Sequence, residues 1–95
     1  MNDKALAERI KVRAGAAVWR RVDDATVLLA LDSSTYIGLN RTGTQLWPLM
    51  IEGTTRRELV DLLMSRFDVD AAQATADVEA FVDACDEHGL LIAQR

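Results

Sequence analysis

Two residues that could do chemistry lie three positions apart near the end of the chain, Cys85 and His88. A thiol nucleophile needs a base and a third group that orients the base, and the sequence offers no such third group nearby. Cys85 also falls on the apolar face of a helical pattern, where free cysteine usually packs as a small hydrophobe. As the single cysteine, it excludes an internal disulfide and fits a reducing compartment. We therefore expect no catalytic residues.

Carboxylates gather in two other places, the pair Asp23-Asp24 and the group Asp83, Asp86 and Glu87. Aspartate is common in turns because its side chain bonds the local backbone, which explains the pair. The second group fits the solvated side of a helix and has no matching ligand set for a cation. One histidine and one cysteine cannot complete a tetrahedral zinc site, and the five glycines are too scattered for a phosphate loop. We expect neither a metal nor a cofactor.

The composition is that of a globular protein. With 95 residues, 49% hydrophobic and 27% charged, the chain predicts a single domain over 1–95. It has no apolar run of the roughly 20 residues that a membrane span needs, and no secretory signal, so we expect a cytoplasmic protein without a membrane partner. The net charge of −4 disfavours binding to a phosphate backbone, so we expect no nucleic-acid partner.

The first part of the chain predicts an antiparallel meander over residues 16–40, after a partly ordered segment over 1–15 that contains a short strand near 10–13. Short polar turns separate the expected strands, so consecutive strands should pair and the third should lie at an edge. The second is apolar at nearly every position, which is typical of a strand covered on both faces. Gly38 in the third adds no side chain, so another backbone could approach closely. The expected strands are Ala17–Val22, Thr26–Leu31 and Thr35–Leu39.

Residues 41–92 predict three helices. The spacing of Thr42 and Gln45 matches a capping box for the first helix, but Pro48 should leave that helix short, bent or started late. Each helix has an apolar stripe at helical spacing. The second helix has its own capping box, and the third has an N-cap and a glycine stop. These signals come, in order, from Thr55, Glu58, Asp70 and Gly89, and the third stripe is Ala74, Val78, Phe81, Val82 and Cys85. Strands followed by helices indicate an α+β fold.

The segment Leu39-Asn40-x-Thr42-Gly43-x-x-Leu46-Trp47 is the most specific pattern in the sequence. With the matching segments on either side of it, the chain resembles the PqqD-like family over about residues 17–92. Three features depart from the family pattern: Ser33-Ser34 replaces a turn glycine, Ile37 replaces a second aromatic residue, and Pro48 is unexpected. The other matching segments are Val27 to Asp32, Tyr36 to Gly38, Gly53-Thr54, Leu59, Leu62-Leu63, Phe67, Asp77-Val78, Phe81-Val82 and Gly89-Leu90-Leu91.

The resemblance implies a precursor-peptide recognition element, and its details look more like the stand-alone leader-binding protein of a lasso-peptide pathway than like the quinone-cofactor type. It implies a winged helix-turn-helix-like fold and a leader peptide that docks as an added strand on the third strand, beside the third helix. The chain would then deliver the leader to a leader peptidase or another modifying enzyme. Within this arrangement we expect Ile37 and Leu39 mainly to support the core and Tyr36 to lie at the groove. The candidate peptide-binding residues are Ser34, Thr35, Tyr36, Ile37, Gly38, Leu39, Ala74, Asp77, Val78 and Phe81.

Three alternatives stay open. A winged-helix fold could bind nucleic acid, although the expected third helix carries several carboxylates and no lysine or arginine. The open sheet edge could instead pair with a second copy, which would make the chain a small structural or dimerisation subunit. A thiol enzyme that uses Cys85 and His88 is the third alternative.

Overall fold

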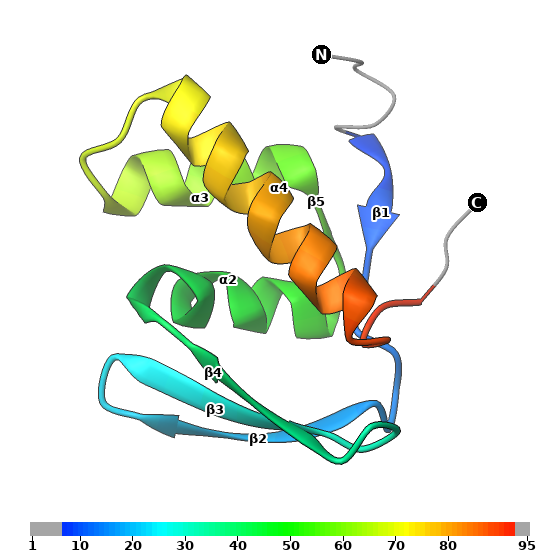
Figure 1. Ribbon diagram of the computed structural model, residues 1–95. Helices are drawn as coiled ribbons and strands as arrows, with labels where there is room; N and C mark the ends of the chain where they lie inside the picture. Colours follow the sequence, from blue (N-terminus) through cyan, green and yellow to red (C-terminus); the bar gives the residue numbers. More distant parts are fainter. Residues whose placement is uncertain (1–6, 93–95) are drawn as a thin grey trace.

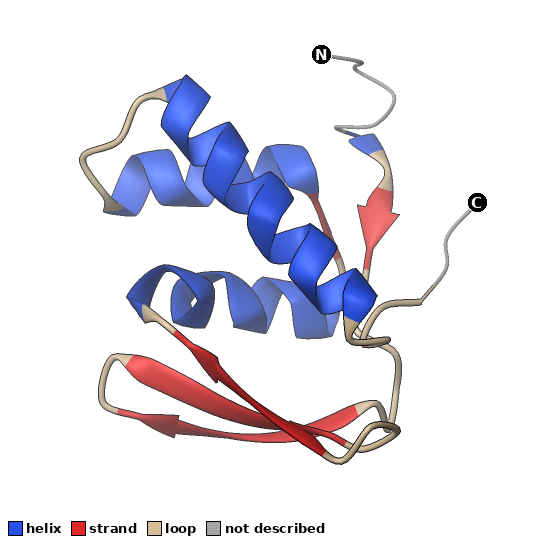
Figure 2. Ribbon diagram, viewed as in Figure 1, coloured by secondary structure: helices blue, strands red, loops and turns tan. Residues whose placement is uncertain are grey.

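The computed structural model describes residues 7–92 and has an α+β fold, in which a three-stranded antiparallel sheet comes before three helices (Figures 1 and 2). The predicted fold class is therefore confirmed. Residues 1–6 of the expected N-terminal segment lie outside the described residues. The elements are β1 (Arg9–Ile10), β2 (Ala17–Val22), β3 (Ala25–Ala30), β4 (Thr35–Leu39), α2 (Arg41–Glu52), β5 (Thr54–Thr55), α3 (Arg56–Arg66) and α4 (Ala71–Glu87).

The meander has the order β2-β3-β4, as the short turns predict. In its register Leu28 of β3 lies opposite Ile37 of β4, and Leu29 lies opposite Tyr36. Alternate residues of a strand point to opposite faces, so Leu28 and Ile37 share the face that the helices cover. Leu28 is fully buried, whereas Val27 on the other face is 42% exposed. The expectation that both faces of this strand are covered is therefore wrong, because the helices lie on one face of the sheet (Figure 1).

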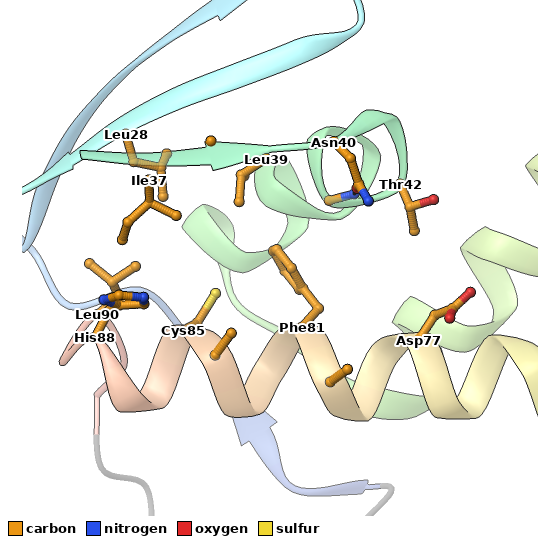
Figure 3. A pocket seen from close by; sticks show the side chains of 14 residues that line it. Leu28, Ile37, Leu39, Asn40, Thr42, Asp77, Phe81, Cys85, His88 and Leu90 are labelled. Carbon is orange, nitrogen blue, oxygen red and sulfur yellow. The ribbon is translucent and has the colours of Figure 1, made fainter. Parts of the chain in front are cut away.

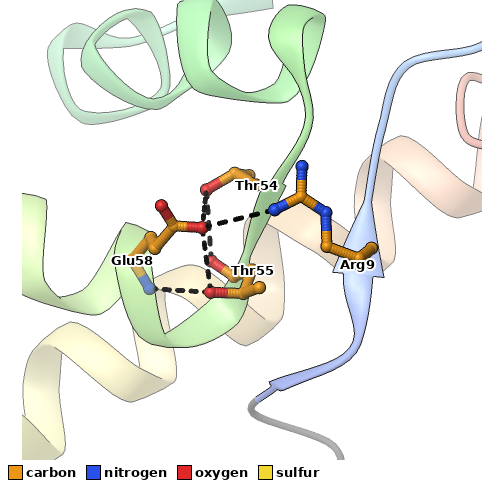
Figure 4. Close-up of polar contacts among 4 residues, drawn as sticks. All are labelled: Arg9, Thr54, Thr55 and Glu58. Carbon is orange, nitrogen blue, oxygen red and sulfur yellow. Dashed lines mark hydrogen bonds and ion pairs between the residues drawn. The ribbon is translucent and has the colours of Figure 1, made fainter.

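The N-terminal strand does not touch the sheet edge. β1 pairs with β5, and Val12 forms a bridge with Leu91, so the segment before β2 runs along the helices (Figure 1). Arg9 contacts Glu58 at 4.0 Å beside the hydroxyls of Thr54 and Thr55 (Figure 4). A short strand near residues 10–13 was expected, but its partner was not. Among residues 7–92 no other strand pairs with the outer edge of β4.

Helix α2 begins earlier than its sequence indicates. Its N-cap is Asn40, whose Oδ1 accepts a hydrogen bond from the Gly43 N–H at 2.9 Å, so the prediction of Thr42 as the cap is wrong. The helix runs for 12 residues through Pro48, so two of the three expected effects of this proline, a short helix and a late start, are wrong. Proline removes one backbone donor, and burial of neighbours such as Trp47, 2% exposed, offsets that loss.

The other helix ends follow their sequence signals. Thr55 Oγ1 accepts from the Glu58 N–H at 3.2 Å (Figure 4), and Asp70 Oδ1 accepts from the Gln73 N–H at 2.8 Å, so both predicted N-caps are confirmed. Gly89 ends α4 at φ 71°, a left-handed conformation that glycine adopts without strain. The Leu90 N–H then bonds the Cys85 carbonyl at 3.0 Å. This closed end places Leu90 in the core.

The core fills the space between the inner face of the sheet and the three helices. Trp47 lies there, and its ring meets Trp19 edge to face with centroids 5.6 Å apart. A buried hydrogen bond of 3.0 Å between the hydroxyls of Thr26 and Thr44 ties β3 to the start of α2. Together these contacts hold the sheet against α2, whose N-terminal end borders the site. The fully buried members of the core include Leu28, Leu46, Met50, Leu59, Ala74 and Val78.

Candidate functional site

A groove of about 500 Å³ lies between the edge strand β4 and helix α4 (Figure 3). Leu28 of β3, Leu90 after α4 and the start of α2 form part of its lining. Ile37 and Leu39 point from β4 toward α4, while Phe81 and Cys85 point from α4 toward β4 (Figure 3). The full lining is Leu28, Ile37, Gly38, Leu39, Asn40, Thr42, Gly43, Asp77, Ala80, Phe81, Ala84, Cys85, His88 and Leu90. The groove is thus a mostly apolar trough along an unpaired strand edge.

Two different stripes run along α4. Ala74, Val78 and Val82 are buried in the core at no more than 2% exposure. The groove-facing stripe is Asp77, Ala80, Phe81, Ala84 and His88, offset from the core stripe by part of a turn. Alanine at two of these positions, Ala80 and Ala84, leaves space beside the helix.

The polar groups of the groove lie at its two ends (Figure 3). Asp77 lies at the end near Thr42, and its Oδ1 accepts a hydrogen bond from Gln73 Nε2 at 2.8 Å. His88 lies at the opposite end near Leu90 (Figure 3). Between them the lining is apolar apart from the backbone of β4. Within the described lining Asp77 is the single carboxylate, so that end of the groove carries negative charge.

The thiol of Cys85 is suited to packing rather than to attack. Its residue is 4% exposed, and desolvation by burial raises its pKa from 9.0 to about 12. A thiolate nucleophile requires the opposite shift. Within residues 7–92 no hydrogen bond joins Cys85 to His88, and no group of three metal-ligating side chains occurs. In the same described part of the chain no helix is long and apolar enough to cross a membrane.

The structure brings together half of the predicted site residues. Ile37, Gly38, Leu39, Asp77 and Phe81 line the groove.

The other half lies elsewhere. Ala74 and Val78 are fully buried in the core, and Ser34 lies in the turn before β4 at φ 54°. Thr35 and Tyr36 are outside the lining, and Tyr36 is 74% exposed on the outer face of the sheet. The predicted place of Tyr36 is therefore corrected, because its side chain faces away from the groove. Ile37 and Leu39 pack with the core, as expected, and they also line the groove.

Sequence reasoning missed most of the groove that comes from α4 and α2. Helical spacing from Asp77 could have predicted Ala80, Ala84 and His88 on the same face. Alanine by itself, however, gives no indication of a binding site. No sequence signal placed the start of α2 at the groove. The other missed residues are Leu28, Asn40, Thr42, Gly43, Cys85 and Leu90.

Two solved structures share the fold. A structure of TbiB1 in complex with the TbiA(beta) leader peptide is 34% identical over 85% of this chain and 93% of that chain, with a TM-score of 0.77. A lasso peptide synthetase B1 complexed with its leader peptide is 24% identical over 88% of this chain and 98% of that chain, with a TM-score of 0.75. A comparison with curated proteins finds no match. The model of the family described as coenzyme PQQ synthesis protein D matches residues 25–91, and the chain therefore belongs to the PqqD family.

Proposed function

We propose that this protein binds the leader segment of a ribosomally made precursor peptide as an added strand on β4. The observation that carries the proposal is the free edge of β4, which borders an apolar groove against α4. An unpaired strand edge offers N–H and C=O groups to an extended peptide, and pockets beside it select alternate side chains. The complexes of TbiB1 and of the lasso peptide synthetase B1 with leader peptides support the same function.

The recognition step needs no bond-making chemistry. A leader that is disordered in solution loses conformational entropy on docking, and the backbone bonds and apolar contacts must offset that loss. We expect a dissociation constant between nanomolar and micromolar, or about −8 to −12 kcal/mol. The protein then acts in the cytoplasm as a non-catalytic adaptor, which hands the bound leader to a leader peptidase or another modifying enzyme of a lasso-peptide pathway.

The acidic character of α4 weighs against the nucleic-acid alternative. In a winged helix that reads DNA the exposed face of the recognition helix carries cations, whereas α4 carries Asp77, Glu79, Asp83, Asp86 and Glu87. Helix α4 (Ala71–Glu87) contains no lysine or arginine. Carboxylates on this helix repel phosphates, and Asp77 alone lies in the groove, where it suits a cationic side chain of the peptide.

Calorimetry tests the proposal. The full chain is titrated with the TbiA(beta) leader peptide and with the N-terminal segments of short peptides encoded beside its own gene, and a scrambled version of each serves as the control. We expect at least one leader to bind with one-to-one stoichiometry while its scrambled version does not. If none binds, or if scrambled and native leaders bind equally, the proposed function is wrong.

A further inference from the structure

Gly43 lies in the first turn of α2, buried against the groove. Apart from proline, glycine is the least favourable residue inside a helix, since it loses the most backbone freedom. The described positive φ values belong to other residues, so the backbone of Gly43 does not itself require glycine. Helix formation alone would favour alanine here, and the reason for glycine must lie in the surrounding space.

That space is limited by Phe81 and Leu39. A Cβ built on Gly43 would lie 3.2 Å from Cε1 of Phe81 and 3.3 Å from Cβ of Leu39. Each separation is tighter than ordinary van der Waals contact, so each neighbour must give by a few tenths of an ångström. The Cβ of Leu39 is fixed by the strand ladder, in which Leu39 pairs with Thr26. The Phe81 ring is the far end of a half-buried side chain, and it borders the open groove (Figure 3).

We infer that Gly43 sets the width of the leader groove by letting the Phe81 ring lie back against α2. Gly43 is a positioning residue in this account, since it acts through Phe81. A methyl group at residue 43 displaces the ring by a few tenths of an ångström toward the groove, which narrows the space for an incoming apolar side chain. The inference rests on the proposed function for its meaning, but the ring position can be measured without any peptide.

The first test therefore uses the protein alone. In Gly43→Ala the side-chain NMR contacts of Phe81 should shift away from α2 and toward Ile37, across the groove. Thermal unfolding should stay cooperative, because the ring has room to move and the contact with the Leu39 Cβ needs a shift of only a few tenths of an ångström. If the ring keeps its wild-type contacts in the folded variant, the inference is overturned.

The second test measures binding of the TbiA(beta) leader peptide, or of the leader that binds best to the wild type. We expect Gly43→Ala to weaken binding roughly tenfold, as overpacking of a close-fitting site does. Adding Phe81→Leu removes the contact with the ring, which is the one that narrows the groove, so the double variant should bind like Phe81→Leu alone. Adding Phe67→Leu, a substitution outside the groove, should bring no rescue.

The outcomes separate the two claims. If the wild type binds none of the peptides, the proposed function fails and the NMR result decides the inference about the groove. If the wild type binds and Gly43→Ala binds equally well, the inference fails while the proposed function stands. Additive losses from Gly43→Ala and Phe81→Leu would also overturn it, because residues that act through one contact are not additive.

Discussion

Truncation of Phe81 should separate the leader affinity of this protein from its stability. The ring lines the middle of the groove and is half-buried in the free protein. Cutting a fully buried phenylalanine to alanine costs about 3–5 kcal/mol of unfolding free energy. Because part of the Phe81 ring is already in water, we expect Phe81→Ala to cost about half of that range, which leaves the domain folded.

Phe81→Ala should weaken leader binding by more than burial of the exposed part of the ring alone would account for. A docked leader covers the rest of the ring, and central aromatic residues of an interface typically lose at least about 2 kcal/mol when truncated. This corresponds to roughly 30-fold weaker binding, since about 1.4 kcal/mol is a factor of ten. Fluorescence anisotropy with a labelled leader peptide measures the affinity, and circular dichroism on heating measures the stability.

Phe67→Ala is the matched control. Phe67 is also a half-buried phenylalanine, but it lies at the end of α3, outside the groove, with the Arg41 guanidinium 5.3 Å from its ring centroid. It should lose comparable stability while keeping wild-type affinity. Equal loss of affinity in both variants would mean that binding reports general destabilisation, and unchanged affinity in Phe81→Ala would refute the assignment of the groove.

Three further variants test other parts of the account. Tyr36→Ala should keep leader affinity within about threefold in the anisotropy assay, because the ring points away from the groove and an exposed contact contributes little; a loss as large as that of Phe81→Ala would place the peptide on the outer face. Asp77→Asn should weaken binding of a leader with a lysine or arginine at that end by about threefold and should flatten its salt dependence; an unchanged salt dependence would remove Asp77 from the site. Burial raises the pKa of Cys85 from 9.0 to about 12, so the unfolded thiol ionises first and the unfolding free energy should fall by about 1.4 kcal/mol per pH unit between those values. In denaturant titrations, Cys85→Ala should lack this part of the fall in unfolding free energy at alkaline pH. A pH profile identical to that of the wild type would contradict the effect of burial on the thiol.

Local patterns predicted most of the elements. Alternating apolar residues and short turns gave β2 and β4 within their observed bounds, and the caps Thr55 and Asp70 were read from side chains that bond nearby amides. These features depend on residues a few positions apart, so one sequence contains the necessary information. The start of α2 was missed because Asn40 competes with Thr42 for the same role, and the observed backbone favours the earlier residue.

Features that depend on distant residues were predicted less well. The pairing of β1 with β5 joins two-residue strands far apart in sequence, and such short segments have no distinct pattern. Predicting the groove also depends on the orientation of α4 relative to β4. The sequence places Phe81 on an apolar stripe, but it does not show that Ala80 and Ala84 line a groove beside it. Tyr36 was predicted at the groove because an amphipathic ring suits an interface, whereas the groove lies on the inner face of the edge strand.

Amide hydrogen exchange on the complex tests strand addition at β4 most directly. The rates are measured residue by residue by NMR, with and without a saturating leader peptide that calorimetry has shown to bind. Strand addition predicts that outward-facing amides of β4 (Thr35–Leu39), which are free at the edge, become strongly protected, while the opposite edge of the sheet, β2 (Ala17–Val22), is unchanged. Protection that appears at β2, or binding that leaves every β4 amide as exchangeable as before, would contradict the account.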